Sequence, residues 1–243
     1  MRIAILSFSA SDNEKNETFL AVSRAGMQPE KFVWNEATDA LEKCDGYILS
    51  GDFSTHMRTL AEGNLVRETL RAESHLGKPI LGLGQGAKLL LETGLIPGVE
   101  HDKPCITLTD DMSADDNQAA THIHLSRHYQ FNAFTRHLQP DTLLPIPVSH
   151  PKKCFVIPPA LFAEMQLLGS TVFQYCDANG KNDPVNPIAA VSNKAGNVMA
   201  MLVHPITGQE SDLIFQSMHD YIKEGYVQRV LPMNYYPRGN FTA

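Results

Sequence analysis

Short apolar runs that alternate with helix-like stretches are the feature that most restricts the fold of this chain. The runs lie at Arg2–Ser7, Lys31–Trp34, Gly46–Ser50 and Pro79–Leu83. Helical patterns separate them at residues 16–25, about 55–75 and 85–93. Apolar runs of this length are typical of strands buried on both faces of a parallel sheet. The alternation therefore predicts an α/β fold with a mostly parallel sheet flanked by helices.

The second half of the chain has a different pattern. Between Cys105 and Phe173, short runs are separated by polar loops, which predicts antiparallel strands added to one edge of the sheet. Residues 188–191 and 198–203 flank the turn Asn193–Asn197, a pattern typical of a hairpin. A closing helix is expected at 212–224.

Length and composition predict one soluble globular domain over residues 1–243, with a C-terminal tail from about 226 to 243. Hydrophobic residues make up 43% of the chain and charged residues 19%. The net charge of −7 argues against nucleic acid as a partner, because binding phosphates needs a basic face. No apolar run approaches the roughly 20 residues of a membrane helix, and the N-terminus lacks the pattern of a signal peptide. Four cysteines without a CxxC pair favour a reduced, cytoplasmic protein without a zinc knuckle.

A glycine-rich turn follows the run that ends at Leu83. Its sequence, Gly82-Leu83-Gly84-Gln85-Gly86, has the G-x-nucleophile-x-G spacing of a nucleophile elbow. In such a turn the central side chain lies beside a helix N-terminus, where a negative charge is stabilised. Here the central residue is Gly84, which has no side chain for attack. The alternative interpretation is a plain glycine-rich link between a strand and a helix.

Candidate site residues also follow two other predicted strands. They lie at the carboxyl ends of the strands, where α/β proteins have their active and binding sites. His204 and Ile206 follow the run ending at Val203, and in an extended segment they point to the same side. A nucleophile–histidine–acid triad needs a carboxylate that orients the imidazole, whereas Ile206 is aliphatic. The turn Ser50–Ser54 offers backbone N–H groups for an oxyanion hole.

These residues, with others in the same order along the chain, resemble the class I (triad-type) glutamine amidotransferases. The closest resemblance is to the glutaminase component of phosphoribosylformylglycinamidine synthase, an enzyme of purine synthesis. Its most specific segments here are Gly94-Leu-Ile-Pro-Gly98 and Pro147-Val-Ser-His150. Further matching segments are Phe32–Trp34, Asp45–Leu49, Gly51–Ser54, Gly77–Gly82, Gly196–Met201, His204-Pro205 and Ile214–Ser217.

The resemblance implies a flavodoxin-like fold and a reaction that releases ammonia from glutamine for a synthetase partner, without a metal or cofactor. By position, the family's nucleophilic cysteine falls on Gly84, its histidine on His204 and its orienting glutamate on Ile206. Gly51, Asp52 and Gln85 fall on oxyanion- or substrate-binding positions. The family's Pro-Gly-Gly-Phe-Ser turn reads Ser50-Gly-Asp-Phe-Ser54 here, and a carboxylate facing the pocket would oppose a developing oxyanion.

Substitutes for the missing groups stay open at this stage. Glu210 is a candidate for the acid beside His204. Cys105, Cys154 and Cys176 are candidates for a relocated nucleophile, although nothing in the sequence brings them to the elbow. His122 and His124 share a strand face near His128, so they form either a metal site or an exposed polar face.

Three functions therefore compete. The first is an amidotransferase-like protein of purine biosynthesis that cannot hydrolyse glutamine and is a scaffold or regulator for the formylglycinamidine ribotide synthetase subunit. The second is a pseudoenzyme that binds or senses glutamine or a related small molecule. The third is a glutaminase with a relocated nucleophile.

Overall fold

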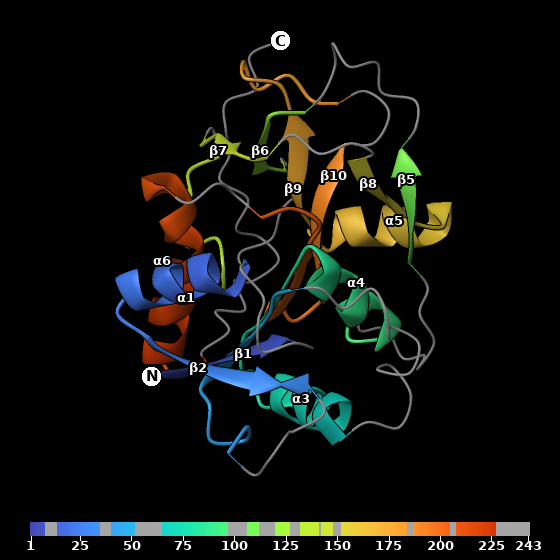
Figure 1. The fold of residues 1–243 in the computed structure, drawn as a ribbon. Helices are drawn as coiled ribbons and strands as arrows, with labels where there is room; N and C mark the ends of the chain where they lie inside the picture. Colours follow the sequence, from blue (N-terminus) through green and yellow to red (C-terminus); the bar gives the residue numbers. More distant parts are fainter. Residues whose placement is uncertain are drawn as a thin grey trace.

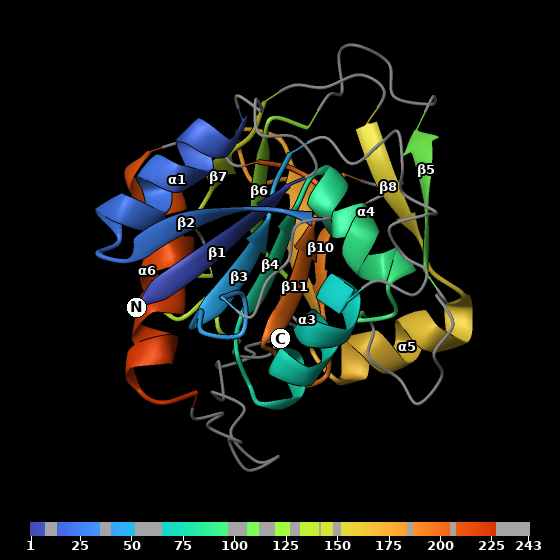
Figure 2. The same ribbon diagram turned by 60° about the horizontal axis from the view of Figure 1, so that its bottom comes forward.

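A mixed sheet runs through the molecule and carries helices on both faces (Figures 1 and 2). The structure is a computed structural model that describes residues 1–7, 14–34, 40–51, 65–96, 106–111, 120–126, 132–140, 142–147, 152–183, 187–204 and 208–226. Within these ranges the sheet has nine strands in the order β2-β1-β3-β4-β11-β10-β9-β6-β7.

The parallel half of the sheet comes mainly from the first part of the chain. Its strands are β2 (Gln28–Val33), β1 (Arg2–Ser7), β3 (Gly46–Leu49), β4 (Ile80–Leu83) and β11 (Val198–Met201). The residues of β3, β4 and β11 are buried throughout, as their continuous apolar runs predict.

The other half of the sheet is antiparallel. Its strands are β10 (Ile188–Ser192), β9 (Thr171–Cys176), β6 (His122–Leu125) and β7 (Leu144–Pro145). β10 and β11 form the predicted hairpin, although β11 ends at Met201 rather than Val203.

Helices cover the two faces of the sheet (Figure 2). α1 (Glu14–Arg24) and α6 (Gln209–Lys223) pack together on one face. α3 (Leu65–His75) and α4 (Gln85–Glu92) lie on the opposite face. Alternate residues of β1 serve the two cores: Ile3 and Ile5 face the first, and Ala4 and Leu6 the second. The predicted α/β fold is confirmed, while the part of the expected 55–75 helix before Leu65 and the tail after Tyr226 lie outside the described residues.

Two expectations need correction. The strands between Cys105 and Phe173 do not all join the sheet edge: β5 (Thr107–Asp111) and β8 (Lys152–Val156) pair with each other in a separate two-stranded sheet. Between β8 and β9 lies α5 (Pro159–Leu167), which the sequence did not indicate. The segment is apolar on most sides, from buried Met165 to exposed Leu167, so it shows no helical periodicity.

The first residues of β2 were also missed. The apolar run begins at Lys31, but the strand begins three residues earlier, at Gln28, because it pairs along the whole of β1. Being an edge strand, β2 tolerates Pro29 and polar side chains. Arg2 of β1 forms two side-chain hydrogen bonds with Glu30 of β2, each of 2.6 Å.

Asn197 ties the hairpin to the end of α3. Its side chain is fully buried, and Nδ2 donates to the carbonyls of Ser74 (2.8 Å) and Lys78 (3.0 Å). Oδ1 accepts a hydrogen bond of 3.0 Å from Asn193 Nδ2. This one side chain therefore fixes the loop that leads into β4, the strand that precedes Gly84.

Asn197→Ala is expected to lower the free energy of unfolding by about 2–4 kcal/mol, because it removes the side-chain donor to the Lys78 carbonyl and one of the two donors to the Ser74 carbonyl, and opens a small cavity. Urea unfolding followed by circular dichroism measures the change. Lys194→Ala is the control: it lies in the same turn but is exposed, so a change within about 0.5 kcal/mol is expected. Equal effects of the two substitutions would contradict the role of Asn197.

No helix within the described ranges has both the length and the apolar character needed to cross a membrane.

Candidate functional site

Gly84 lies at the bend between β4 and α4, in the middle of the glycine-rich turn. Its φ of +55° and ψ of −112° lie in a region that L side chains rarely adopt. The Gly84 N–H donates to the Met201 carbonyl (2.9 Å), which holds the turn against the end of β11. The sharp backbone geometry expected of an elbow is therefore present, without an elbow side chain.

The three glycines of the turn serve different purposes. A Cβ on Gly86 would lie 2.1 Å from the Leu49 carbonyl oxygen, and one on Gly82 would lie 2.7 Å from the Gly86 oxygen. Both approaches are too short for any side chain. A Cβ on Gly84 would meet nothing closer than His204 Cδ2 at 3.6 Å, with His204 Nε2 at 3.9 Å. Position 84 is thus open to a side chain, and that side chain would face the imidazole.

His204 follows β11 and is largely enclosed, with Nε2 buried. Burial lowers the pKa of His204 below its ordinary value, and the charge of Glu17 on α1 opposes this shift more weakly. The imidazole is therefore neutral at physiological pH, as a general base requires.

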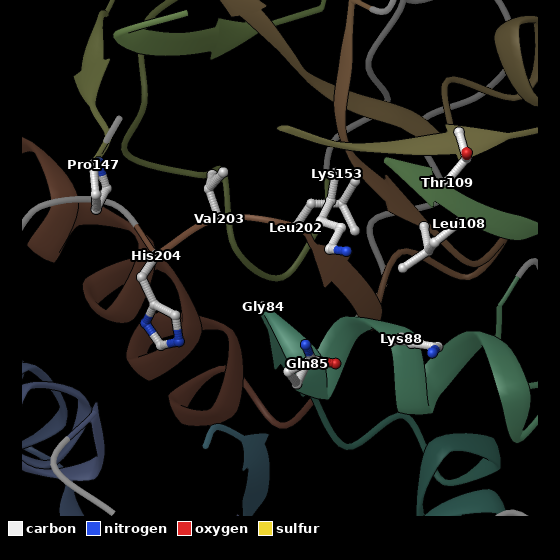
Figure 3. A pocket seen from close by; sticks show the side chains of 10 residues that line it. All are labelled: Gly84, Gln85, Lys88, Leu108, Thr109, Pro147, Lys153, Leu202, Val203 and His204. Carbon is white, nitrogen blue, oxygen red and sulfur yellow. The ribbon is translucent and has the colours of Figure 1, made fainter. Parts of the chain in front are cut away.

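A cavity of about 490 Å³ opens beside these two residues (Figure 3). Its floor is the first part of α4: Gly84, Gln85 and Lys88. One wall is the segment Leu202–His204. Its roof comes from the separate two-stranded sheet: Leu108, Thr109 and Lys153. The volume lies in the range of sites for small molecules.

The described lining of the cavity includes two lysines. Lys88 on the floor and Lys153 in the roof both line it, and no Asp or Glu is among the lining residues that the structure describes. The sequence did not point to either lysine. Lys88 could have been found as a residue of the helix after the elbow, whereas the place of Lys153 depends on how β5 and β8 fold over α4.

Residues 1–211 match the model of the CobB/CobQ-like glutamine amidotransferase domain. The chain belongs to this family. Among curated proteins, the phosphoribosylformylglycinamidine synthase subunit PurQ of Methanothrix thermoacetophila is 30% identical over 233 residues, covering 84% of this chain and 86% of the relative. The PurQ subunit of Koribacter versatilis is 26% identical over 239 residues, covering 90% of this chain and 97% of the relative.

Solved structures agree on the fold. A chain in the structure of PurLQS from Thermotoga maritima has a TM-score of 0.67 and 21% identity, covering 91% of this chain and 98% of that one. The glutaminase domain of the Trypanosoma brucei protein CTPS, with bound acivicin, has a TM-score of 0.55 and 11% identity, covering 92% and 94%. The expected flavodoxin-like amidotransferase fold and the resemblance to PurQ, the glutaminase-type subunit, are confirmed.

The amidotransferase fold brings together some of the predicted site residues. Gly84 and His204 face each other, and Gln85 lines the same cavity. Gly51 is buried two residues after the end of β3, with a φ of +125°. Asp52 and Ile206 lie outside the described residues, so their positions remain predictions.

None of the described candidate substitutes is among the residues that line the cavity. Glu210 is exposed near the start of α6, and the carboxylate whose charge acts on His204 is that of Glu17. His122 Nδ1 lies 2.8 Å from the Thr121 hydroxyl, and His124 Nε2 is hydrogen-bonded to Asn182. His128 is outside the described residues, and within the described ranges no three His, Cys, Asp or Glu side chains are grouped to hold a metal ion.

The described cysteines are poor candidates for a nucleophile. Cys44, Cys154 and Cys176 are buried thiols, and none of them lines the cavity. Burial raises the pKa of Cys44 and Cys176 to about 11, so very little reactive thiolate forms at neutral pH. Cys105 lies outside the described residues.

Proposed function

We propose that this protein is a PurQ-type amidotransferase subunit of purine biosynthesis that does not hydrolyse glutamine. Its role is that of a scaffold or regulatory partner of the formylglycinamidine ribotide synthetase subunit, which would then use free ammonia. The relatives named as PurQ subunits of the synthase support the pathway, and the solved PurLQS structure supports a multi-subunit setting.

One observation carries the loss of hydrolysis: the position that faces His204 is a glycine. The fold keeps the strained turn, the helix N-terminus and the neutral imidazole, but no thiol stands where a Cβ would lie 3.9 Å from Nε2. In enzymes with a nucleophilic triad, loss of the nucleophile costs on the order of 10⁶ in turnover. Ile206 adds to this proposal, since the triad acid would also be absent.

Glutamine incubated with the wild-type protein is therefore expected to release ammonia at the buffer rate, both alone and with a synthetase subunit. A coupled glutamate dehydrogenase assay measures the release. The positive control is an active PurQ protein, tested with the same synthetase. Ammonia release that exceeds the buffer rate and fails in His204→Ala would overturn the proposal and favour a relocated nucleophile.

The partner role has its own measurement. Mixed with the synthetase subunit, the wild-type chain is expected to elute with it in size-exclusion chromatography. Its addition should leave the ammonia-dependent synthetase reaction intact. Separate elution at micromolar concentrations would contradict the scaffold role. It would not be evidence that the protein hydrolyses glutamine.

The second candidate function, a binding or sensing pseudoenzyme, is favoured by the cavity itself. If the site no longer bound any ligand, side chains would be expected to fill it. Instead a cavity of about 490 Å³ lies between α4 and the two-stranded sheet. A ligand that binds without turnover is compatible with docking on a synthetase, so the two roles can coexist in one protein.

A further inference from the structure

α5 is apolar on most of its sides, yet only one of its nine residues, Met165, is buried. A helix with apolar residues on all sides is normally packed inside a protein. Here one side reaches solvent, since Leu167 is 85% exposed and Ala160 and Ala163 are exposed as well. α5 lies at the periphery of the molecule in both ribbon views (Figures 1 and 2). The helix therefore has one side in the core and one apolar side in water.

Ala160, Ala163 and Leu167 form a stripe along α5, called the α5 stripe below. Their spacing of three and then four residues places them on the same side of the helix. The same spacing forms the seam between the helices of a coiled coil. Within residues 154–168 the only charged residue is Glu164, which lies beside the stripe and not in it. The stripe thus has the pattern of a surface for packing against another helix.

The exposed leucines near α3 have different surroundings. Leu65, the first residue of α3, is 68% exposed, and Leu76, directly after the helix, is 67% exposed. The residues between them include four with charged side chains, Arg67, Glu68, Arg71 and Glu73. Single exposed leucines among charged residues are common on soluble proteins and indicate no partner. The α5 stripe differs because its exposed apolar side chains are neighbours.

Charge and shape both favour a second copy of this chain as the occupant of the stripe. Each copy has a net charge of −7, so two copies repel each other and associate best through a surface with few charges. In an antiparallel pair with a two-fold axis beside Ala163, Leu167 of one copy lies against Ala160 of the other. The large side chain then meets a small one twice, once on each side of the axis.

The size of α5 sets the expected strength of the pair. A nine-residue helix is about 14 Å long, so the contact covers less than the roughly 800 Å² per partner of a stable complex. A weak dimer, with a dissociation constant in the micromolar range, is therefore expected.

We propose that the α5 stripe is a self-association surface, on which two copies of this chain pair through antiparallel contact of their α5 helices. α5 ends just before β9, which runs in the same direction as β4. The end of α5 therefore lies at the edge of the sheet opposite to Gly84, and the pairing leaves the cavity beside Gly84 accessible. The inference is independent of the proposed function, because it involves neither glutamine nor a synthetase.

Sedimentation equilibrium in about 0.15 M salt, at protein concentrations from about 5 to 500 µM, tests the proposal. The average mass of the wild type is expected to rise from that of one chain toward that of two. Leu167→Glu is expected to weaken the association by at least about tenfold, because each copy brings a carboxylate into the apolar contact. Leu76→Glu is the matched control: it adds the same charge at a similarly exposed leucine, so it should associate as the wild type does.

Disulfide cross-linking tests the arrangement of the two helices. In a Cys105→Ser background, Ala163→Cys lies beside the two-fold axis. Under oxidation by copper phenanthroline it is expected to join two chains at least about tenfold faster than Leu65→Cys, since pairing raises the effective concentration of the thiols. Equal rates for the two variants would overturn the antiparallel pairing.

Three further results would overturn the proposal: a wild type that has the mass of one chain throughout, equal association of Leu167→Glu and Leu76→Glu, or association that continues beyond two chains. Thermal unfolding shows that each variant is folded, which is expected because all the substituted side chains of α5 and α3 are exposed. Ammonia release and binding to the synthetase are measured separately, so a failure of the proposed function is distinguishable from a failure of self-association.

Discussion

Gly84→Cys is expected to create a thiol that iodoacetamide alkylates about 10³-fold faster at pH 7 than the thiols of Cys44 or Cys176. The new Sγ would start from a Cβ 3.9 Å from His204 Nε2 and lie beside the N-terminus of α4. Thiols in such surroundings have pKa values near or below 7, whereas burial raises the pKa of Cys44 and Cys176 to about 11. A thiol with a pKa of 11 is ionised to about one part in 10⁴ at pH 7, which sets the size of the effect.

Peptide mass spectrometry after timed alkylation identifies the reactive position. The experiment is made in a Cys105→Ser background, because Cys105 lies outside the described residues. Adding His204→Ala should slow the alkylation, since the imidazole no longer accepts the proton. If the introduced thiol reacts no faster than a free cysteine, the turn does not activate a thiol. The site would then resemble a nucleophile elbow in its backbone geometry alone.

Gly86→Ala is expected to abolish the stable fold. The added Cβ would lie 2.1 Å from the Leu49 carbonyl oxygen and 2.6 Å from its carbon, so α4 would have to move away from β3. Both elements belong to the buried core, and backbone atoms cannot give way as a flexible side chain does. A loss of more than about 4 kcal/mol is expected, a large part of the total stability of an ordinary domain.

Gly84→Ala is the matched control, two residues away in the same turn. Its Cβ has room, and the cost is the strain of an L residue at φ +55°, about 1–3 kcal/mol. Soluble yield, circular dichroism and urea unfolding should show a folded but weakened Gly84→Ala and no cooperative transition for Gly86→Ala. Similar stabilities for the two variants would mean that α4 and β3 are not packed as closely as the distances state.

Part of the fold could be predicted from the sequence alone. The sequence predicted β1, β3 and β4 from their continuous apolar runs, and the β10–β11 hairpin from its turn residues. Both signals lie within the element itself, because a strand buried on both faces needs apolar residues throughout and a hairpin needs particular residues at its turn. The edge strand β2 was predicted too short, since its first residues are strand only through pairing with β1. α5 was missed because its apolar residues follow no helical period.

The sequence by itself determined that a glycine occupies the elbow position, that His204 follows a buried strand, and that the chain belongs with the amidotransferases. These are matters of residue identity and order. Only the tertiary structure decided that position 84 has room and faces the imidazole, while Gly82 and Gly86 are closed by backbone contacts. It also decided that Lys88 and Lys153 share one cavity, because residues 65 positions apart meet only when the β5–β8 sheet folds over α4. Contacts between distant segments depend on the packing of whole elements, which no local pattern of residues encodes.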